Sequence, residues 1–203
     1  MIVFLKLTLF LKRAFDIMFS FLGIVIIWPF LLIIALIVII DSPGGAIYKQ
    51  ERIGKDGKPF NIFKFRTMMK NTGLELTLAN DERVTRVGGF LRKYKLDELP
   101  QLFNVLGGSM SLVGPRPEVR KYVEMYNKEQ RRVLSVRPGV TDMASIKYSD
   151  ETSLMEDAEE MEKIYIDTIM PDKLSLNLEY IDNLSVMNDI KIIFSTLKKV
   201  FIK

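Results

Sequence analysis

The sequence predicts a mostly helical α+β protein with a long apolar helix near its N-terminus and a short β-hairpin after it. Residues 17–40 carry no charged side chain, which indicates a membrane segment. Residues 46–68 alternate as two short strands around the turn Lys55-Asp56-Gly57-Lys58. Most later segments have helical spacing of apolar residues. We expect a re-entrant membrane helix over 1–41, a cytosolic domain over 42–185 and an amphipathic helix over 186–203.

Composition limits the chemistry available to the chain. Among its 203 residues there is no cysteine and no histidine, which excludes thiol nucleophiles, histidine general bases, Cys/His zinc sites and disulfides. There is also no P-loop or GxGxxG fingerprint. The net charge of +4 and the pI of about 9.1 favour an anionic partner, namely nucleic acid, acidic lipid or a phosphorylated substrate.

The apolar segment 17–40 is long enough to cross a bilayer, which needs roughly 20 residues, and too long for the core of a signal peptide. Pro29 lies mid-segment and predicts a kink. Basic residues on both flanks favour the cytoplasmic side; these are Lys6, Lys12, Arg13, Lys49, Arg52, Lys55 and Lys58. The pattern favours a re-entrant helix broken at Pro29, with both ends cytoplasmic, over a straight spanning helix.

The C-terminal segment 186–203 has an apolar stripe at helical spacing beside a basic side. The apolar positions are Ile190, Ile193, Phe194, Leu197, Val200 and Phe201, and the basic positions are Lys191, Lys198, Lys199 and Lys203. Such a helix can lie in the lipid interface and contact anionic lipids. The same pattern would also suit a terminal helix that packs against the core of the domain, and the sequence does not distinguish the two arrangements.

Basic residues recur in settings that suggest phosphate binding. In the second strand, alternation places Lys64 and Arg66 on one face, either as solvated side chains or as half of a phosphate clamp. Arg92 belongs to the basic face of a helix expected after residue 81. Arg116 and Arg137 each precede a proline, which holds them in extended backbone. Guanidinium groups bind phosphate oxygens bidentately, so the five residues together predict an anion site.

Two adjacent carboxylates follow the basic helix. We expect a second helix from Leu96 to Leu106, with Asp97 as its N-cap and Glu98 in its first turn. The helix dipole and the charges of Arg92 and Lys95 would favour the ionised form of Asp97. An ionised carboxylate can serve as a nucleophile or as a magnesium ligand.

Seven fragments, in order, resemble the bacterial sugar transferases, specifically the small monotopic phosphoglycosyl transferases. They are KRAFD at 12–16, SPG at 42–44, QERIG at 50–54, FKFRTM at 63–68, LDELPQLFNV at 96–105, VGPRP at 113–117 and VRPGVT at 136–141. Each fragment alone is weak, but their order and spacing are specific, and the resemblance covers nearly the whole chain.

The resemblance implies transfer of a phosphosugar from a UDP-sugar to undecaprenyl phosphate at the cytoplasmic face of a bacterial inner membrane, with release of UMP. It implies Mg²⁺ as cofactor and a ping-pong route, in which Asp97 attacks the phosphorus that bears the sugar and the lipid phosphate then displaces Asp97. It assigns Asp97 and Glu98 as catalytic residues and Asp97 as the metal ligand. It also implies that the membrane helix is re-entrant and broken at a proline.

One departure concerns the donor. Many members of the family continue after the Arg-Pro-Gly-x-Thr motif with a Gly-Trp-Ala-Gln segment that ends in Asn-Gly-Arg. Here Ser149 stands where that arginine would align, and Lys147 is the nearest cation. The departure leaves open which UDP-sugar is used. The sequence also leaves open the glycan pathway and the oligomeric state, for which a homodimer is one alternative.

Two other functions compete with the transferase. A catalytically inactive membrane scaffold of a glycan assembly complex would be consistent with the change at Ser149. A nucleic-acid binder would use aromatic residues beside basic ones, such as Phe63 and Phe65, but a chain tethered to lipid argues against a nucleic-acid partner. The intact LDELP segment favours the enzyme.

Overall fold

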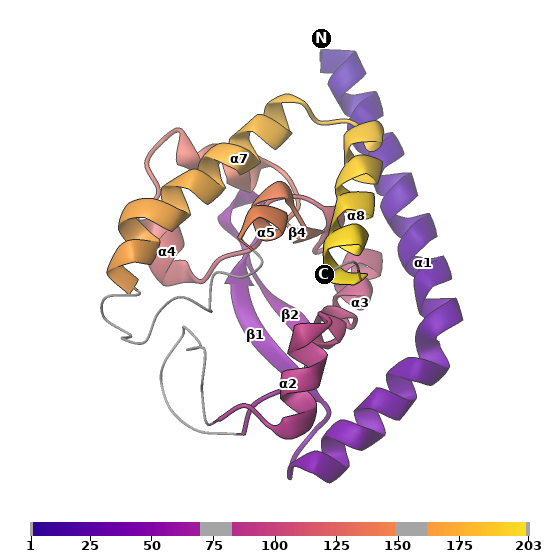
Figure 1. The fold of residues 1–203 in the computed structure, drawn as a ribbon. Helices are drawn as coiled ribbons and strands as arrows, with labels where there is room; N and C mark the ends of the chain where they lie inside the picture. The colour runs from indigo at the N-terminus through magenta and orange to yellow at the C-terminus, as the bar shows by residue number, and fades with distance from the viewer. Residues whose placement is uncertain (1, 70–82, 149–161, 202–203) are drawn as a thin grey trace.

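A computed structural model of the chain describes residues 2–69, 83–148 and 162–201. Helices predominate over these residues, and the strands form two small sheets (Figure 1), so the predicted mostly helical fold with a β-hairpin is confirmed. The elements, with η for 3₁₀- and π-helices, are α1 (Ile2–Asp41), β1 (Ile47–Ile53), η1 (Lys55–Gly57), β2 (Pro59–Phe65), α2 (Arg86–Lys93), η2 (Leu96–Glu98), α3 (Gln101–Gly107), β3 (Ser111–Val113), α4 (Arg120–Glu124), η3 (Gln130–Ser135), β4 (Gly139–Thr141), α5 (Met143–Lys147), η5 (Tyr165–Ile169), α7 (Met170–Asp182) and α8 (Val186–Phe201).

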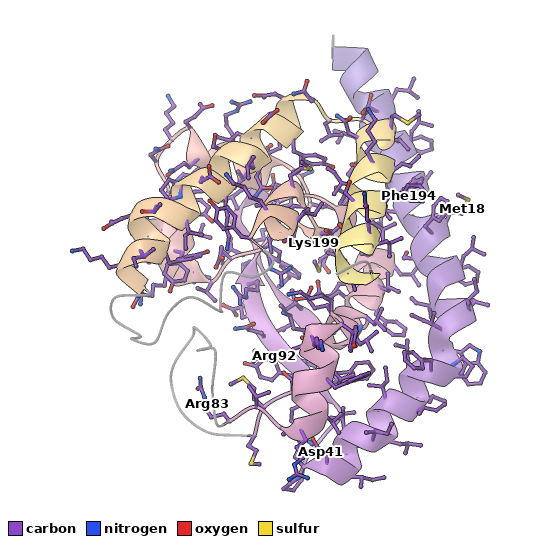
Figure 2. The ribbon with its side chains drawn as sticks, in the orientation of Figure 1. Met18, Asp41, Arg83, Arg92, Phe194 and Lys199 are labelled. Atoms are coloured by element: carbon purple, nitrogen blue, oxygen red, sulfur yellow. The ribbon has the colours of Figure 1, made fainter. Side chains whose placement is uncertain are left out.

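Helix α1 is long and apolar enough to cross a membrane. It changes direction along its length and follows one side of the domain (Figure 1). Pro29 lies inside it without ending it, so α1 is continuous at the position where the sequence predicted a break. The side of α1 that faces away from the domain is apolar: Phe10, Ile26 and Ile40 are 69%, 74% and 84% exposed. Figure 2 shows Met18 on this outer side.

Both halves of α1 pack against the domain. In the second half, Leu31, Ile34 and Val38 form a buried cluster with Phe65 of β2 and Leu91 of α2. In the first half, Asp16 accepts a hydrogen bond from the backbone N–H of Leu112, 3.0 Å away. Both halves of α1 therefore stay in contact with the domain.

The predicted β-hairpin is confirmed. Strands β1 and β2 pair antiparallel, with Ile47 opposite Phe65 and Ile53 opposite Pro59. The turn between them contains Asp56 and Gly57 in the left-handed region, at φ of 58° and 72°. Aspartate and glycine are among the residues that adopt this region at least cost, which is why the pattern identified the turn correctly.

A second sheet joins the two Arg-Pro segments. Strands β3 and β4 pair in parallel, with Ser111 opposite Gly139 and Val113 opposite Thr141. The two backbones approach closely: a Cβ atom at Gly139 would lie 2.1 Å from the backbone nitrogen of Gly114. The Arg-Pro motifs predicted two stiff segments but not their pairing, which aligns the segments side by side.

Helix α8 forms where the sequence predicted it. Its inner side carries Asp189 and Ile192, which are 1% and 5% exposed, while Phe194 and Leu197 are exposed. Ile192 packs with Val113 and Tyr180. One side of the helix therefore packs on the domain, and part of the predicted apolar stripe is left exposed, where Figure 2 shows Phe194.

Candidate active site

The acidic pair lies in a short turn rather than in the predicted helix. Leu96–Glu98 form one turn of 3₁₀-helix, and α3 begins only at Gln101. Asp97 is therefore not the N-cap of that helix, and this prediction was wrong. Pro100 explains the difference, because it has no N–H to bond the carbonyl of Leu96. The N–H of Leu99 instead donates to that carbonyl at 3.3 Å.

Glu98 is buried and held by two cations. Its Oε1 lies 2.9 Å from Nζ of Lys64 on β2 and also accepts from Nη2 of Arg116. Oε2 lies 3.4 Å from Nη1 of Arg116. Burial alone would raise the pKa of Glu98, but the charges of Arg116 and Lys64 outweigh it and hold that pKa well below its usual range. Glu98 is ionised and both its oxygens are engaged.

Asp97 is buried and differs from its neighbour in having a free oxygen. Its Oδ1 has no solvent contact and no hydrogen-bond partner. Burial, followed by the negative charge of Glu98, raises the pKa of Asp97, while the charges of Lys64, Lys95 and Arg92 act in the opposite direction. The expectation that the surroundings favour the ionised form was wrong in its net direction, because desolvation exceeds the effect of the cations.

Asn104 fixes this turn against the hairpin. Its Oδ1 accepts from the backbone N–H of Phe63 at 2.9 Å, and its Nδ2 donates to the carbonyl of Asn61 at 2.8 Å. The hydrogen bonds join α3 to β2 and so place Lys64 beside Glu98. Asn104 was not predicted as a site residue, although its polar side chain within the apolar run LFNV was a usable signal.

Three of the five predicted phosphate-binding residues gather around the acidic pair. Lys64 and Arg116 contact Glu98 directly, and the charge of Arg92 acts on Asp97; Figure 2 shows Arg92 on α2. The side chain of Arg116 is 39% exposed. It can therefore meet a substrate from solvent while it holds Glu98.

Arg66 does not belong to this cluster. Its guanidinium donates to the carbonyls of Ser42 at 2.6 Å, Pro43 at 2.8 Å and Val38 at 3.3 Å, at the carboxyl end of α1. Strand β2 ends at Phe65, so the alternation that grouped Arg66 with Lys64 no longer applies at this position. The prediction of Arg66 as a phosphate ligand disagrees with this placement.

Arg137 also points elsewhere. Its Nε donates to the carbonyl of Gly108 at 2.9 Å, beyond the carboxyl end of α3, whereas the acidic pair precedes the amino end of that helix. The parallel pairing of β3 and β4 aligns the two Arg-Pro backbones, but only Arg116 reaches the acidic pair. Of the five cations predicted to form an anion site, three lie around the acidic pair.

The segment that departs from the family pattern is described only in part. Ser149 lies outside the described residues. Lys147, the nearest cation in sequence, forms an ion pair with Asp172 of α7, with Nζ 2.7 Å from Oδ2. Lys147 is therefore engaged on the surface between α5 and α7.

The site suits a magnesium ion better than a metal with many protein ligands. Within the described ranges, no three His, Cys, Asp or Glu side chains lie close enough together to hold one metal ion. Magnesium commonly takes only one or two protein carboxylates, together with waters and substrate phosphates. Asp97 fits this role through its unpartnered Oδ1, whereas the carboxylate of Glu98 is already occupied by Lys64 and Arg116.

Comparison with known proteins decides the family. The model of a family described as bacterial sugar transferase matches residues 7–203. The chain belongs to the bacterial sugar transferase family. It is 43% identical over 199 residues to the UDP-glucose:undecaprenyl-phosphate glucose-1-phosphate transferase of Escherichia coli K12, covering 95% of this chain and 40% of that protein.

Two further relatives place this bacterial sugar transferase in context. It is 37% identical to the UDP-N-acetylgalactosamine-undecaprenyl-phosphate N-acetylgalactosaminephosphotransferase of Aeromonas hydrophila, covering 94% of the chain and 44% of the relative. It is also 37% identical to the exopolysaccharide production protein PSS of Rhizobium leguminosarum, covering 92% and 93%. The chain thus spans about two fifths of the first two relatives and nearly all of the third.

Proposed function

We propose that this chain transfers a sugar phosphate from a UDP-sugar to undecaprenyl phosphate and releases UMP. The observation that carries the proposal is Asp97, a buried carboxylate with an unpartnered oxygen among cations. The names of the E. coli and Aeromonas relatives give the class of donor and acceptor. Phosphoryl transfer depends mainly on positioning and charge neutralisation, and this site offers both without histidine.

The proposed reaction is ping-pong. A carboxylate oxygen of Asp97 attacks the phosphorus that bears the sugar, a P–O bond forms, and the P–O bond to UMP breaks. The phosphate of the lipid then attacks the same phosphorus, and the bond to Asp97 breaks to give polyprenyl diphosphate sugar. Arg116, Lys64 and Arg92 supply positive charge for the diphosphate, and Glu98 fixes the positions of the first two.

Magnesium is the proposed cofactor, with Asp97 as its protein ligand. When bound, it would neutralise charge on the diphosphate of the donor. The chain's own residues do the rest: Asn104 holds the turn in place, and Lys64 and Arg116 keep Glu98 ionised beside Asp97.

We also propose a monotopic location on the cytoplasmic face of the bacterial inner membrane, with α1 re-entrant and α8 on anionic lipid. Contacts of both halves of α1 with the domain support this arrangement. The chain has no cysteine, so single cysteines placed by Leu5→Cys and Gly45→Cys can be labelled separately in cells. Labelling of both from the cytoplasm is expected, and labelling from opposite sides would contradict the re-entrant helix.

The reaction is tested with protein in nanodiscs, Mg²⁺, undecaprenyl phosphate and a panel of UDP-sugars. Release of UMP is expected, with Asp97→Asn slower by at least about 1,000-fold. Release of UDP would mean ordinary glycosyl transfer. Full turnover by Asp97→Asn would exclude the covalent route, and no release with any donor would favour the scaffold.

A further inference from the structure

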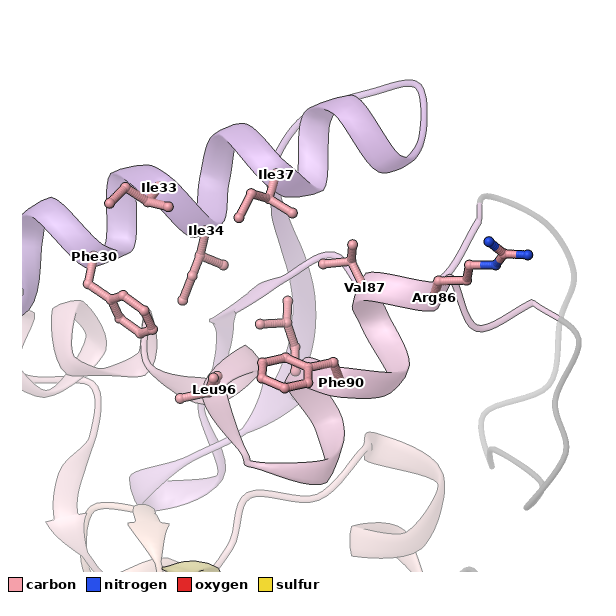
Figure 3. A pocket seen from close by; sticks show the side chains of 9 residues that line it. Phe30, Ile33, Ile34, Ile37, Arg86, Val87, Phe90 and Leu96 are labelled. Atoms are coloured by element: carbon pink, nitrogen blue, oxygen red, sulfur yellow. The ribbon is translucent and has the colours of Figure 1, made fainter.

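An apolar cavity of about 370 Å³ lies between α1 and α2. We call it the α1–α2 cavity. Ile33, Ile34 and Ile37 line it from the second half of α1, and Val87 and Phe90 line it from α2. Figure 3 shows Phe30 and Ile34 of α1 and Val87 of α2 directed toward the space between the two helices, with the guanidinium of Arg86 directed away from it. The volume lies at the lower end of the range for ligand pockets, roughly 300–1,000 Å³.

One wall of the cavity lies next to the acidic pair in the chain. Leu96 forms part of its wall, and Asp97 is the next residue along the same 3₁₀ turn. Arg92 lies on α2, which forms the opposite wall from α1, and its charge acts on Asp97. A molecule with an apolar body in the cavity can therefore present an anionic group to Asp97 and the cations around it.

The walls also restrict what can occupy the cavity. Ile33 is 54% exposed and its neighbour Leu32 is 55% exposed, so the apolar surface continues from the cavity onto the outer side of α1. A peptide entering here would bring backbone N–H and C=O groups without partners, which is costly in apolar surroundings. A hydrocarbon chain carries no such groups.

Building on the proposed function, we propose that the α1–α2 cavity holds the isoprenoid units next to the phosphate of the polyprenyl phosphate acceptor. The remaining units would extend over α1 into the bilayer. The cavity then selects the acceptor, while the donor is bound on the side of Lys64 and Arg116. Changes in the cavity should affect the second half of the reaction and leave the first half unchanged.

Adjacent positions of α1 provide matched variants for a kinetic test. Ile33→Trp fills the cavity, whereas Leu32→Trp adds the same side chain at an equally exposed position that does not line it. In nanodiscs, Ile33→Trp should raise the apparent KM for undecaprenyl phosphate about tenfold or more, equivalent to at least about 1.4 kcal/mol. Exchange of labelled UMP into the UDP-sugar without lipid acceptor should stay unchanged, as should both measurements for Leu32→Trp. Equal KM values for the two variants, with wild-type transfer intact, would overturn the cavity proposal alone.

A photolabelling test does not require turnover. p-Benzoylphenylalanine replaces Phe90, which lines the cavity, or Phe103, which is 47% exposed on α3 and does not line it. Undecaprenyl phosphate should be captured at position 90 in preference to position 103, and farnesyl phosphate should compete. Equal capture at both positions, or equal competition by phosphatidylglycerol, would show that ordinary bilayer chains fill the cavity and would overturn the proposal. Specific capture without sugar-phosphate transfer would uphold it while refuting the proposed reaction.

Discussion

Nζ of Lys12 lies 2.6 Å from Oδ2 of Asp189, although 177 positions separate the two residues. The same Nζ donates to the carbonyl of Val113 at 2.8 Å. Asp189 also accepts from the hydroxyl of Tyr180 at 2.6 Å. The pair is almost fully buried, with side-chain exposures of 7% and 1%. It ties the first half of α1 to α8, β3 and α7, and so joins this long apolar helix to the domain that carries the acidic pair.

Replacing one partner should destabilise the fold strongly. Lys12→Met leaves the carboxylate of Asp189 buried and uncompensated, which costs about 3–5 kcal/mol. Thermal unfolding of the purified protein, followed by circular dichroism, measures the loss. Lys191→Met removes an exposed lysine from the same helix α8 and should change stability by less than about 0.5 kcal/mol.

The double variant Lys12→Met/Asp189→Asn separates the two causes of that loss. It contains no uncompensated charge and should recover much of the stability that Lys12→Met loses. If the double variant is as unstable as Lys12→Met, packing of the lysine side chain matters more than the ion pair.

The pH dependence of turnover should follow ionisation of Asp97. As a nucleophile it must be ionised, so activity falls as the pH drops through its pKa, which burial and Glu98 raise. Glu98→Gln removes the neighbouring negative charge and should move the acid limb of the kcat profile to lower pH. It also frees Lys64 and Arg116 from their partner, and kcat should fall about 100-fold.

Lys64→Met supplies the opposite change. The charge of Lys64 lowers the pKa of Asp97, so its removal should move the acid limb to higher pH. Acid limbs that move in the same direction in both variants would exclude Asp97 as the group that controls the profile.

Two neighbouring glycines in α2 should respond differently to alanine. A Cβ atom at Gly88 would lie 2.1 Å from the carbonyl oxygen of Thr67, whereas at Gly89 the nearest atom, Cγ1 of Val84, is 4.0 Å away. Gly88→Ala should force α2 away from the backbone of Thr67 and cost about 1–3 kcal/mol. Gly89→Ala should stabilise the helix by about 0.5–1 kcal/mol. Thermal unfolding compares them, and similar melting temperatures would contradict the close contact.

Local patterns predicted the elements well. Alternation and the Asp-Gly turn gave the β1–β2 hairpin, and helical spacing gave α8, because both depend on neighbours in sequence. Pairing of β3 with β4 was missed, since each strand is three residues long and its partner lies far along the chain. Local spacing carries little information about such contacts.

Site chemistry was predicted less completely. The charge of each residue near Asp97 is evident from the sequence, but the extent of its burial is not, and burial decides the direction of its pKa shift. Arg137 was grouped with Arg116 by its Arg-Pro motif, yet the carbonyl it contacts belongs to Gly108. A motif fixes the local backbone, whereas the direction of a long side chain depends on hydrogen-bond acceptors that distant parts of the chain supply.

Arg66 and Arg116 test that distinction directly. Arg66 is 8% exposed and donates to three carbonyls at the end of α1, so Arg66→Met should lower stability by about 3 kcal/mol without changing the KM for the UDP-sugar. Arg116 is partly exposed, and Lys64 still pairs with Glu98 in its absence, so Arg116→Met should lower kcat/KM about 100-fold with a smaller loss of stability than Arg66→Met. The same UMP-release assay and thermal unfolding serve both variants. A raised KM with unchanged stability for Arg66→Met would return Arg66 to the phosphate site, because only contact with the donor would then explain its effect.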